Sequence, residues 1–333
     1  MKKIYVKIYF ITETERRMGM NKLGLFLFMT ILMMIWGFNV SAIKILVSSF
    51  PPITITAIRI LVAGFFVFLM LGVIGKVRRP NRKEFQYIIY GGLFNITAHH
   101  FFLAHGLMET TGANGGLILG SGPVLTAILS AIIIKTMPSR MQIIGFIFGI
   151  IGVSFIVVIG NGGLSGFSFG DIYIFLSILS QAFSFILISK AAKTIDSRLL
   201  TGYMLVFGGI ILAIISLISE PLAFTNLLDA PSSLWILFLA SAILATAIGQ
   251  MGYNYAISKI GPAEAAIFLN LNTFFALVGS ALFLGEQITV YHWVGLVFII
   301  PGVLLGSGAI ESLLRKRRTE KMKPIKEKNV ANK

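Results

Sequence analysis

Three apolar runs separated by short polar breaks fill residues 85–153, FQYIIYGGLFNITAHHFFLAHGLMETTGANGGLILGSGPVLTAILSAIIIKTMPSRMQIIGFIFGIIGV. A weaker copy of this stretch follows at residues 235–303, at a constant shift of 150 positions and without a gap. The matching positions include Pro123 with Thr273, Ser130 with Ser280, Gly145 with Gly295 and Gly152 with Gly302. The sequence therefore predicts a unit of three helices that occurs twice.

Any two apolar stretches resemble each other, so a chance likeness is the alternative to a duplication. The polar breaks argue against chance, because they keep the same register as the apolar residues. The break at residues 108–112 matches the break at 258–262, and the break at 135–139 matches the one at 285–289. We therefore expect a true internal duplication.

The composition is that of a membrane protein. Apolar residues make up 56% of the chain and charged residues 12%, whereas a soluble domain carries about a quarter charged residues. The chain has no cysteine, which excludes a disulfide framework and a thiolate metal site. No nucleotide-binding loop is present, and we expect no cofactor and no resident metal.

Ten apolar runs are each long enough to cross a bilayer. They lie near residues 23–46, 52–75, 85–107, 113–134, 140–160, 171–192, 199–219, 235–257, 263–284 and 290–310. The alternating ten-residue pattern of a membrane barrel is missing, so each run can satisfy its backbone only as a helix. The predicted fold class is an all-α integral membrane protein with ten transmembrane helices.

The basic residues predict the orientation of these helices. If the amino end is cytoplasmic, 26 of the 28 Lys and Arg residues fall on cytoplasmic segments. The two exceptions are Lys44 and Arg59, which lie in or beside the first two helices. We expect a multi-pass protein of the cell membrane with both termini in the cytoplasm. The net charge of +15 is then explained by topology, and nucleic acid is not an expected partner.

The predicted organisation is a cytoplasmic arm (1–22), a first repeat (23–160), a second repeat (161–310) and a basic cytoplasmic tail (311–333). A repeat with five helices enters the membrane from opposite sides in its two copies, so the copies are inverted. Such inverted repeats are an architecture of secondary transporters, with the substrate site between the halves near the midplane. The bilayer and a small-molecule substrate are the expected partners.

Five short motifs follow one another along the chain: Trp36-Gly-Phe-Asn39, Pro51-Pro52 followed by Arg59, Gly120-Ser-Gly-Pro-Val124, Gln250 and Phe283-Leu-Gly-Glu286. In this order they resemble the drug/metabolite transporter superfamily, specifically its ten-helix EamA-type members. The first half departs from the second where Lys135-Thr136 stands against Gly285-Glu286. The resemblance covers nearly all of residues 23–310 and implies export or uptake of small metabolites such as amino acids, nucleobases or toxic compounds.

Polar side chains inside the apolar runs are the candidate substrate-binding residues, because hydrocarbon tolerates them only beside a partner or a water-filled cavity. They are Trp36, Asn39, Arg59, Asn95, His99, His100, Gln181, Gln250, Tyr253, Asn254 and Asn270. The alternative is a hydrogen-bonding partner on another helix for the polar groups and packing for Trp36. We expect a cavity lined by the first, third, fourth, sixth, eighth and ninth helices.

Arg59 has two interpretations: it pairs with a carbonyl or carboxylate in a structural role, or it contacts an anionic group of the substrate. His99, His100 and His105 do not converge on one helix face at 100° per residue, which argues against a metal site. One of His99 and His100 is a candidate for proton uptake from the cavity, and a neutral histidine bonded to another helix is the alternative.

The fifth and tenth helices carry few polar residues and instead show glycines spaced four apart, Gly145 with Gly149 and Gly302 with Gly306. Such faces either pack against a neighbouring helix of the same chain or form a homodimer. The leading functional hypothesis is a secondary carrier, an exporter that is driven by protons or facilitated. Import by the same fold, a membrane-embedded enzyme and a channel are the alternatives.

Overall fold

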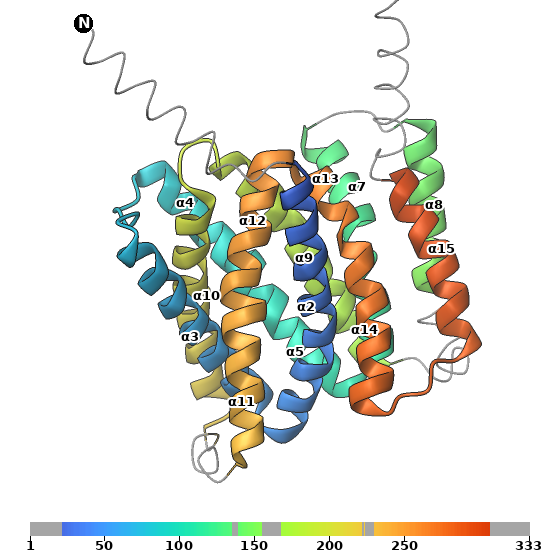
Figure 1. The fold of residues 1–333 in the computed structure, drawn as a ribbon, viewed down its shortest axis with the longest axis horizontal. Helices are drawn as coiled ribbons and strands as arrows, with labels where there is room; N and C mark the ends of the chain where they lie inside the picture. The colour runs from blue at the N-terminus through green and yellow to red at the C-terminus, as the bar shows by residue number, and fades with distance from the viewer. Residues whose placement is uncertain (1–21, 135–138, 155–167, 222, 224–229, 307–333) are drawn as a thin grey trace, which may run out of the picture.

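The computed structural model describes residues 22–134, 139–154, 168–221, 223 and 230–306. Every regular element in these ranges is a helix, and the helices stand side by side as one bundle (Figure 1). Six of the helices are long and apolar enough to cross a membrane by length and composition. Many large apolar side chains are exposed, among them Phe65, Ile218 and Val297, as expected for a surface that faces lipid.

Each of the ten predicted spans coincides with a helix or with helices that follow one another closely. In the first half these are α2 (Lys22–Ser49), α3 (Pro52–Val73), α4 (Arg82–Gly91) with η1 (Gly92–Ala98) and α5 (His99–Glu109), α6 (Gly112–Leu119) with α7 (Gly122–Ile134), and α8 (Arg140–Ser154). In the second half they are α9 (Phe169–Ala191), α10 (Ser197–Ser219), α11 (Ser232–Ala240) with η5 (Ser241–Ile248) and α12 (Gly249–Ile260), α13 (Pro262–Ile267) with α14 (Leu269–Leu284), and α15 (Val290–Gly306). Most of the predicted arm at 1–22, the tail at 311–333 and the far ends of the fifth and tenth spans lie outside the described residues.

The two halves share an unusual local feature. A π-helical turn, in which the hydrogen bonds reach back five residues, interrupts both the third and the eighth span. η1 begins at Gly92 and η5 at Ser241, which is close to the 150-residue shift of the sequence repeat. The fourth and ninth spans are also both broken, between α6 and α7 and between α13 and α14.

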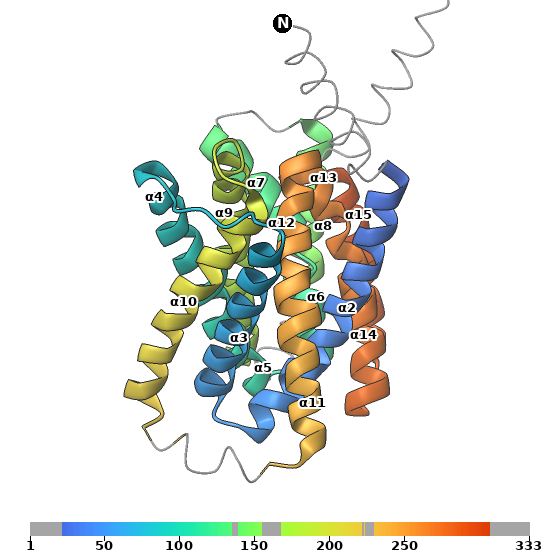
Figure 2. The ribbon, with the colours of Figure 1, turned by 60° about the vertical axis from the view of Figure 1, so that its left-hand side comes forward.

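Four helix pairs make the most extensive contacts: α3 with α10, α8 with α15, α2 with α14, and α5 with α9. Figure 1 shows α8 and α15 at one edge of the bundle and α3, α4 and α10 at the opposite edge. Figure 2, turned by 60°, shows α4 and α10 at the left and α2 and α14 at the right. At the α8–α15 contact, a Cβ added at Gly302 would lie 2.7 Å from the backbone nitrogen of Gly149 and 3.1 Å from the carbonyl of Gly145. These glycines therefore pack within one chain, which is the first of the two alternatives for the fifth and tenth helices.

Carboxylates from the second half cap helices of the first half at one end of the bundle. Glu220 accepts hydrogen bonds from the backbone N–H groups of Ile53 (3.1 Å) and Thr54 (2.8 Å) at the start of α3. Glu286 accepts from the N–H groups of Gly112 (2.8 Å) and Ala113 (2.9 Å) at the start of α6. The first N–H groups of a helix have no partner in their own helix, and an anion there also suits the helix dipole. We call this end, which also holds Glu109, the acidic end.

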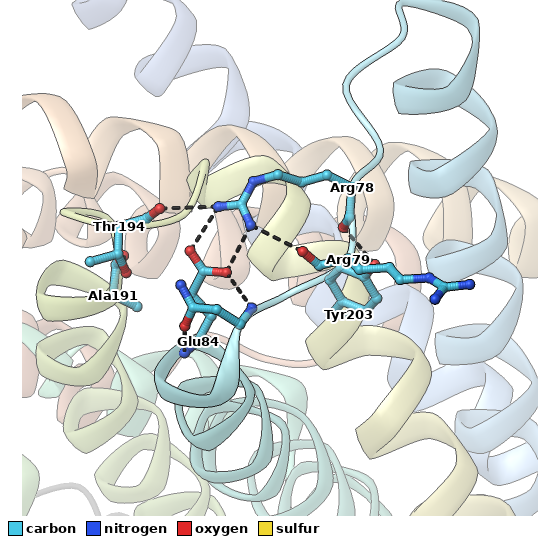
Figure 3. A network of polar contacts seen from close by, with 7 residues as sticks. Arg78, Arg79, Glu84, Ala191, Thr194 and Tyr203 are labelled. Carbon is cyan, nitrogen blue, oxygen red and sulfur yellow. Dashed lines mark hydrogen bonds and ion pairs between the residues drawn. The ribbon is translucent and has the colours of Figure 1, made fainter.

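Basic residues mark the other end, where α4 and α10 begin and α12 ends, and we call it the basic end. Figure 3 shows Arg78 donating to both carboxylate oxygens of Glu84, at 2.8 and 2.7 Å, and to the carbonyl of Thr194 at 3.1 Å. The hydroxyl of Tyr203 donates to the carbonyl of Arg78 at 2.8 Å. Asn81 and Glu84 form a capping box at the start of α4. This network ties the α3–α4 loop to the turn between α9 and α10.

Gly37 provides a test of the α2–α14 contact. A Cβ at Gly37 would lie 2.4 Å from Cβ of Phe275 and 2.8 Å from the carbonyl of Asn272, so backbone would have to move. We expect Gly37→Val to cost about 1–3 kcal/mol and to lower the melting temperature of the purified protein. Gly72→Val is the control, because nothing lies within 4 Å of a Cβ at Gly72. Equal melting temperatures for the two variants would contradict this packing.

The Arg78–Glu84 pair predicts a pH-dependent effect. The hydrogen bond from Arg78 lowers the pKa of the Glu84 carboxyl below its ordinary value. A lowered pKa in the folded state gives stability that is present above the ordinary pKa and is lost as the pH falls through the folded one. We expect Arg78→Gln to lower the melting temperature at neutral pH and to lower it less in acid.

Arg79→Gln is the matched control for this measurement. Its guanidinium points away from the network (Figure 3), so the variant should melt like the wild type at every pH. A deficit in Arg78→Gln that stays constant down to about pH 3, below the ordinary pKa of a glutamate, would contradict the role of the charged pair.

Candidate functional site

A cavity lies in the middle of the bundle, between the two halves of the chain. The space in it that the centre of a water-sized sphere can reach is about 60 Å³, and all of its empty space, with the open part included, is about 560 Å³. Its walls come from α2, α3, α5, α6, α9, η5, α12 and α14. The polar lining residues are Trp36, Asn39, Arg59, His99, His100, Gln181, Thr246, Gln250 and Asn272. Seven of the eleven residues singled out from the sequence are therefore brought together here.

Arg59 is the cation of this cavity, and it is only 2% exposed. It projects from α3, a helix that the sequence did not assign to the cavity wall. Its guanidinium donates to the hydroxyl of Thr246 on η5 at 2.6 Å and meets Nδ1 of His100 at 3.4 Å. Both partners are neutral. Arg59 thus links the first half of the chain to the π turn of the second half.

The contact with Arg59 fixes the tautomer of His100. A guanidinium nitrogen can only donate, so Nδ1 of His100 accepts and the ring proton sits on Nε2. Nε2 is buried and has no hydrogen-bond partner among the described residues. His100 therefore presents one unused donor at the cavity wall.

His99 is held by four contacts from α9, one of which joins its Nδ1 to the carbonyl of Ser177 at 3.2 Å. The Ser177 hydroxyl donates to the His99 carbonyl at 2.9 Å, so its oxygen accepts from Nδ1–H of His99 at 2.7 Å. The amide nitrogen of Gln181 then donates to Nε2 of His99 at 3.0 Å. The ring is neutral in this arrangement, and both of its nitrogens are used. The rings of His99 and His100 meet edge to face, with centroids 4.6 Å apart.

Trp36 of α2 forms part of the cavity wall. Its indole N–H donates to the carbonyl of Ala245 at 2.8 Å, and its ring packs on Tyr253 with centroids 5.0 Å apart. A Cβ at Gly249 would lie 2.4 Å from the indole nitrogen, so the indole fits only because residue 249 has no side chain. Glycine here sets the position of the tryptophan.

Three amides line the cavity with buried oxygens that have no hydrogen-bond partner among the described residues. These oxygens are Oδ1 of Asn39, Oε1 of Gln250 and Oδ1 of Asn272. A buried polar atom is costly when it is left unpaired. The amides come from α2, α12 and α14, so they can accept N–H or O–H groups of a molecule held between the two halves.

Four of the residues singled out from the sequence are not in this lining. Asn95 donates to the hydroxyl of Ser184 at 2.6 Å, and Asn254 donates to Thr201 at 2.9 Å, so each amide bonds to a neighbouring helix away from the cavity. Tyr253 lies behind Trp36 and packs against Phe185. The side chain of Asn270 is outside the described part of the chain. For Asn95 and Asn254, the interhelical alternative describes the observed contacts.

Thr246 and Asn272 line the cavity, although the sequence did not single them out as site residues. Asn272 was visible as a polar residue in an apolar run. Thr246 gave no signal alone, since a threonine in a membrane helix usually bonds to its own backbone. It does so here as well, donating to the carbonyl of Ser241 at 2.9 Å while it accepts from Arg59.

His105, the third histidine of α5, faces away from the cavity. Its Nδ1 contacts the carbonyl of Phe101 at 3.0 Å, and its ring lies against Phe101 and Tyr173. In the ranges that the structure describes, no three His, Cys, Asp or Glu side chains are grouped so that they could hold a metal ion. The chemistry available in the cavity is hydrogen bonding together with the charge of one cation.

Comparison with known proteins gives the same picture of the chain as a whole. The sequence profile of the EamA-like transporter family matches it twice, at residues 23–158 and 168–308. The chain is 30% identical to the uncharacterized transporter YyaM of Bacillus subtilis, over 85% of this chain and 95% of that protein. It is 26% identical to the uncharacterized transporter sll0355 of Synechocystis, over 88% of this chain and 91% of the relative.

A relative in Escherichia coli strain K12, the uncharacterized inner membrane transporter YedA, is 26% identical over 82% of this chain and 87% of its own length. A solved crystal structure superposes with a TM-score of 0.63, covering 87% of this chain and 97% of the other, at 17% identity. That likeness shows the fold alone.

The family and these relatives are transporters and not enzymes, which removes the membrane-embedded enzyme from the alternatives. The family match and the relatives agree with the resemblance found in the sequence motifs and with the apolar helices of the bundle. The two profile matches together cover most of the chain. This multi-pass membrane protein belongs to the EamA-like transporter family.

Proposed function

We propose that this protein is a secondary active transporter that moves small metabolites by alternating access. The observation that carries the proposal is the central cavity, whose polar lining comes from both halves of the chain. A site between two halves becomes accessible from either side of the membrane when the halves rock against each other. Trp36, Asn39, Arg59, His99, His100, Gln181 and Gln250 bind the substrate in this proposal, together with Thr246 and Asn272.

The proposed framework is ten membrane-spanning helices in two inverted repeats, 23–160 and 161–310. Support comes from the double match of the family profile and from the π turns that begin at Gly92 and Ser241. Further support comes from the ends of the helices. The span that begins at Arg82 starts at the basic end, whereas its counterpart, which begins at Ser232, starts from the opposite end (Figure 1).

The proposed location is the cell membrane, with the basic end, the amino-terminal arm and the carboxyl-terminal tail in the cytoplasm. Lys and Arg are concentrated on cytoplasmic segments of membrane proteins. Arg78, Arg198 and Lys259 lie at the basic end, where Arg198 and Lys259 both stand over the ring of Tyr255. Glu220 and Glu286 lie at the acidic end, which is then the outer one.

The transported compound is an amino acid, a nucleobase or a drug-like molecule in this proposal, and the direction is export. A proton gradient drives the cycle, or the substrate moves down its own gradient. His99 and His100 are the groups in the cavity wall that could accept a proton. Import of a metabolite by the same fold is the second candidate, because alternating access works in both directions.

The inverted topology can be tested with single cysteines, because the chain has none of its own. Lys83 and Ser233 are both exposed and lie 150 positions apart, at the starts of α4 and α11. We expect a membrane-impermeant thiol reagent to label Ser233→Cys but not Lys83→Cys in whole cells. Inside-out vesicles should give the reverse result. Labelling of both positions from the same side would contradict the inverted repeats.

Transport itself can be tested in cells that overproduce the protein and grow on toxic amino-acid and nucleobase analogues. An exporter gives resistance, and an importer gives sensitivity. We expect His100→Ala to reduce the effect at least about fivefold, as for loss of one buried hydrogen bond, with unchanged amounts of protein in the membrane. His105→Ala should keep the wild-type effect, because His105 lies outside the cavity. Equal loss in both variants would contradict the assignment of the site.

A further inference from the structure

We propose that the substrate carries one carboxylate and that Arg59 is its counter-charge. This inference rests on the proposed transport function and names the class of compound that the cavity accepts. Arg59 is buried in the centre of the bundle and lines the cavity. Its two hydrogen-bond partners, Thr246 and His100, are both uncharged.

The carboxylates of the described residues are all engaged or located elsewhere. Glu84 pairs with Arg78, and Asp196 pairs with Arg198. Glu220 and Glu286 cap helices at the acidic end, and Asp171 accepts a hydrogen bond from Thr110 at that same end. Glu109 is exposed at the end of α5. None of these carboxylates, which are the ones whose side chains the structure describes, forms an ion pair with Arg59.

A cation buried without an anion is expensive, since neutral hydrogen bonds replace only part of its lost hydration. The guanidinium has five N–H donors, and its two contacts, one of them 3.4 Å long, leave donors available. A carboxylate accepts two parallel hydrogen bonds from such a group, and these charge-assisted bonds are about twice as strong as bonds between neutral groups. An arriving carboxylate would thus remove the charge imbalance of the cavity.

The rest of the lining limits the anion to a single charge on an organic body. One cation stands in the cavity wall, whereas a phosphate with two charges is normally held by several basic groups. Val40, Ile43 and Leu103 give the cavity an apolar wall that suits a carbon skeleton. A neutral nucleobase would leave Arg59 uncompensated. Among the compounds considered above, small monocarboxylates fit this wall best.

The test uses matched pairs of acid and amide on the full-length protein purified in detergent. The pairs are phenylacetate with phenylacetamide, and L-leucine with L-leucinamide, each titrated while the melting temperature is recorded. A ligand that binds the folded state raises the melting temperature. We expect the acids to stabilise the wild type and the amides to have no effect.

Arg59→Gln should weaken the apparent affinity for the acids by about 10- to 100-fold, as for loss of hydrogen bonds to a charged group. Arg59→Lys, which keeps the charge without the planar fork, should lose less. Lys190→Gln is the control, because Lys190 is an exposed cation at the end of α9; this variant should bind like the wild type. If Arg59→Gln does not fold, the comparison of acids with amides on the wild type and on Arg59→Lys decides whether Arg59 binds a carboxylate.

Three results would overturn the proposal: amides that stabilise the wild type as strongly as acids, acids that bind Arg59→Gln as tightly as the wild type, or no stabilisation of the wild type by either acid. Counterflow in proteoliposomes separates these results from a failure of the transport function. Saturable exchange of phenylacetamide, the uncharged amide, without exchange of the acids would keep the carrier and reject the carboxylate site. Acids that bind without any exchange would keep the site and reject the carrier.

Discussion

Hydrocarbon offers no hydrogen bonds, so every backbone group that lies within the membrane must find its partner within the chain. The helix interiors satisfy this requirement by themselves, but the helix ends do not. At the acidic end, Glu220 and Glu286 supply acceptors to the starts of α3 and α6, and Lys44 donates to the carbonyls of Leu107 (2.9 Å) and Thr110 (2.6 Å) where α5 ends. Since both glutamates come from the second half, the hydrogen bonds that cap these helices also join the two halves of the chain.

Much of this fold could be predicted from the sequence, because helices that cross a bilayer need long apolar runs and the loops between them are polar. The direction in which a polar side chain points could not be predicted in the same way. Asn95 and His99 lie one turn apart and both meet α9, yet only His99 reaches the cavity. The π turn η1 changes the angular spacing just before His99, so counting 100° per residue could not give the faces of this helix. Partners such as Ser184 become apparent only in three dimensions.

The two halves share a scaffold but not their chemistry. Thr97 and Thr246 occupy the same position in the two π turns, because each is the sixth residue of its turn. Thr97 donates to the carbonyl of Gly208 on α10 at 3.2 Å, whereas Thr246 meets the guanidinium of Arg59 on α3. His100 and Gln250, which are 150 positions apart, both line the cavity. The repeat that the family profile matches twice thus accounts for a cavity lined by both halves, and the side-chain differences account for the unequal chemistry of its two sides.

The packing of α3 does not require a cation at position 59. The neighbouring Ile60 and Leu61 make the close contact with Gly209 of α10, while Arg59 turns toward the π turn η5. An apolar residue of similar size would avoid the desolvation of a charge, and such replacements are often neutral or stabilising. The free energy spent on burying Arg59 is therefore not explained by the stability of the empty bundle. In our proposal it is explained by a bound state in which an anion shares the cavity, and the cation then belongs to the working cycle of the transporter rather than to its core.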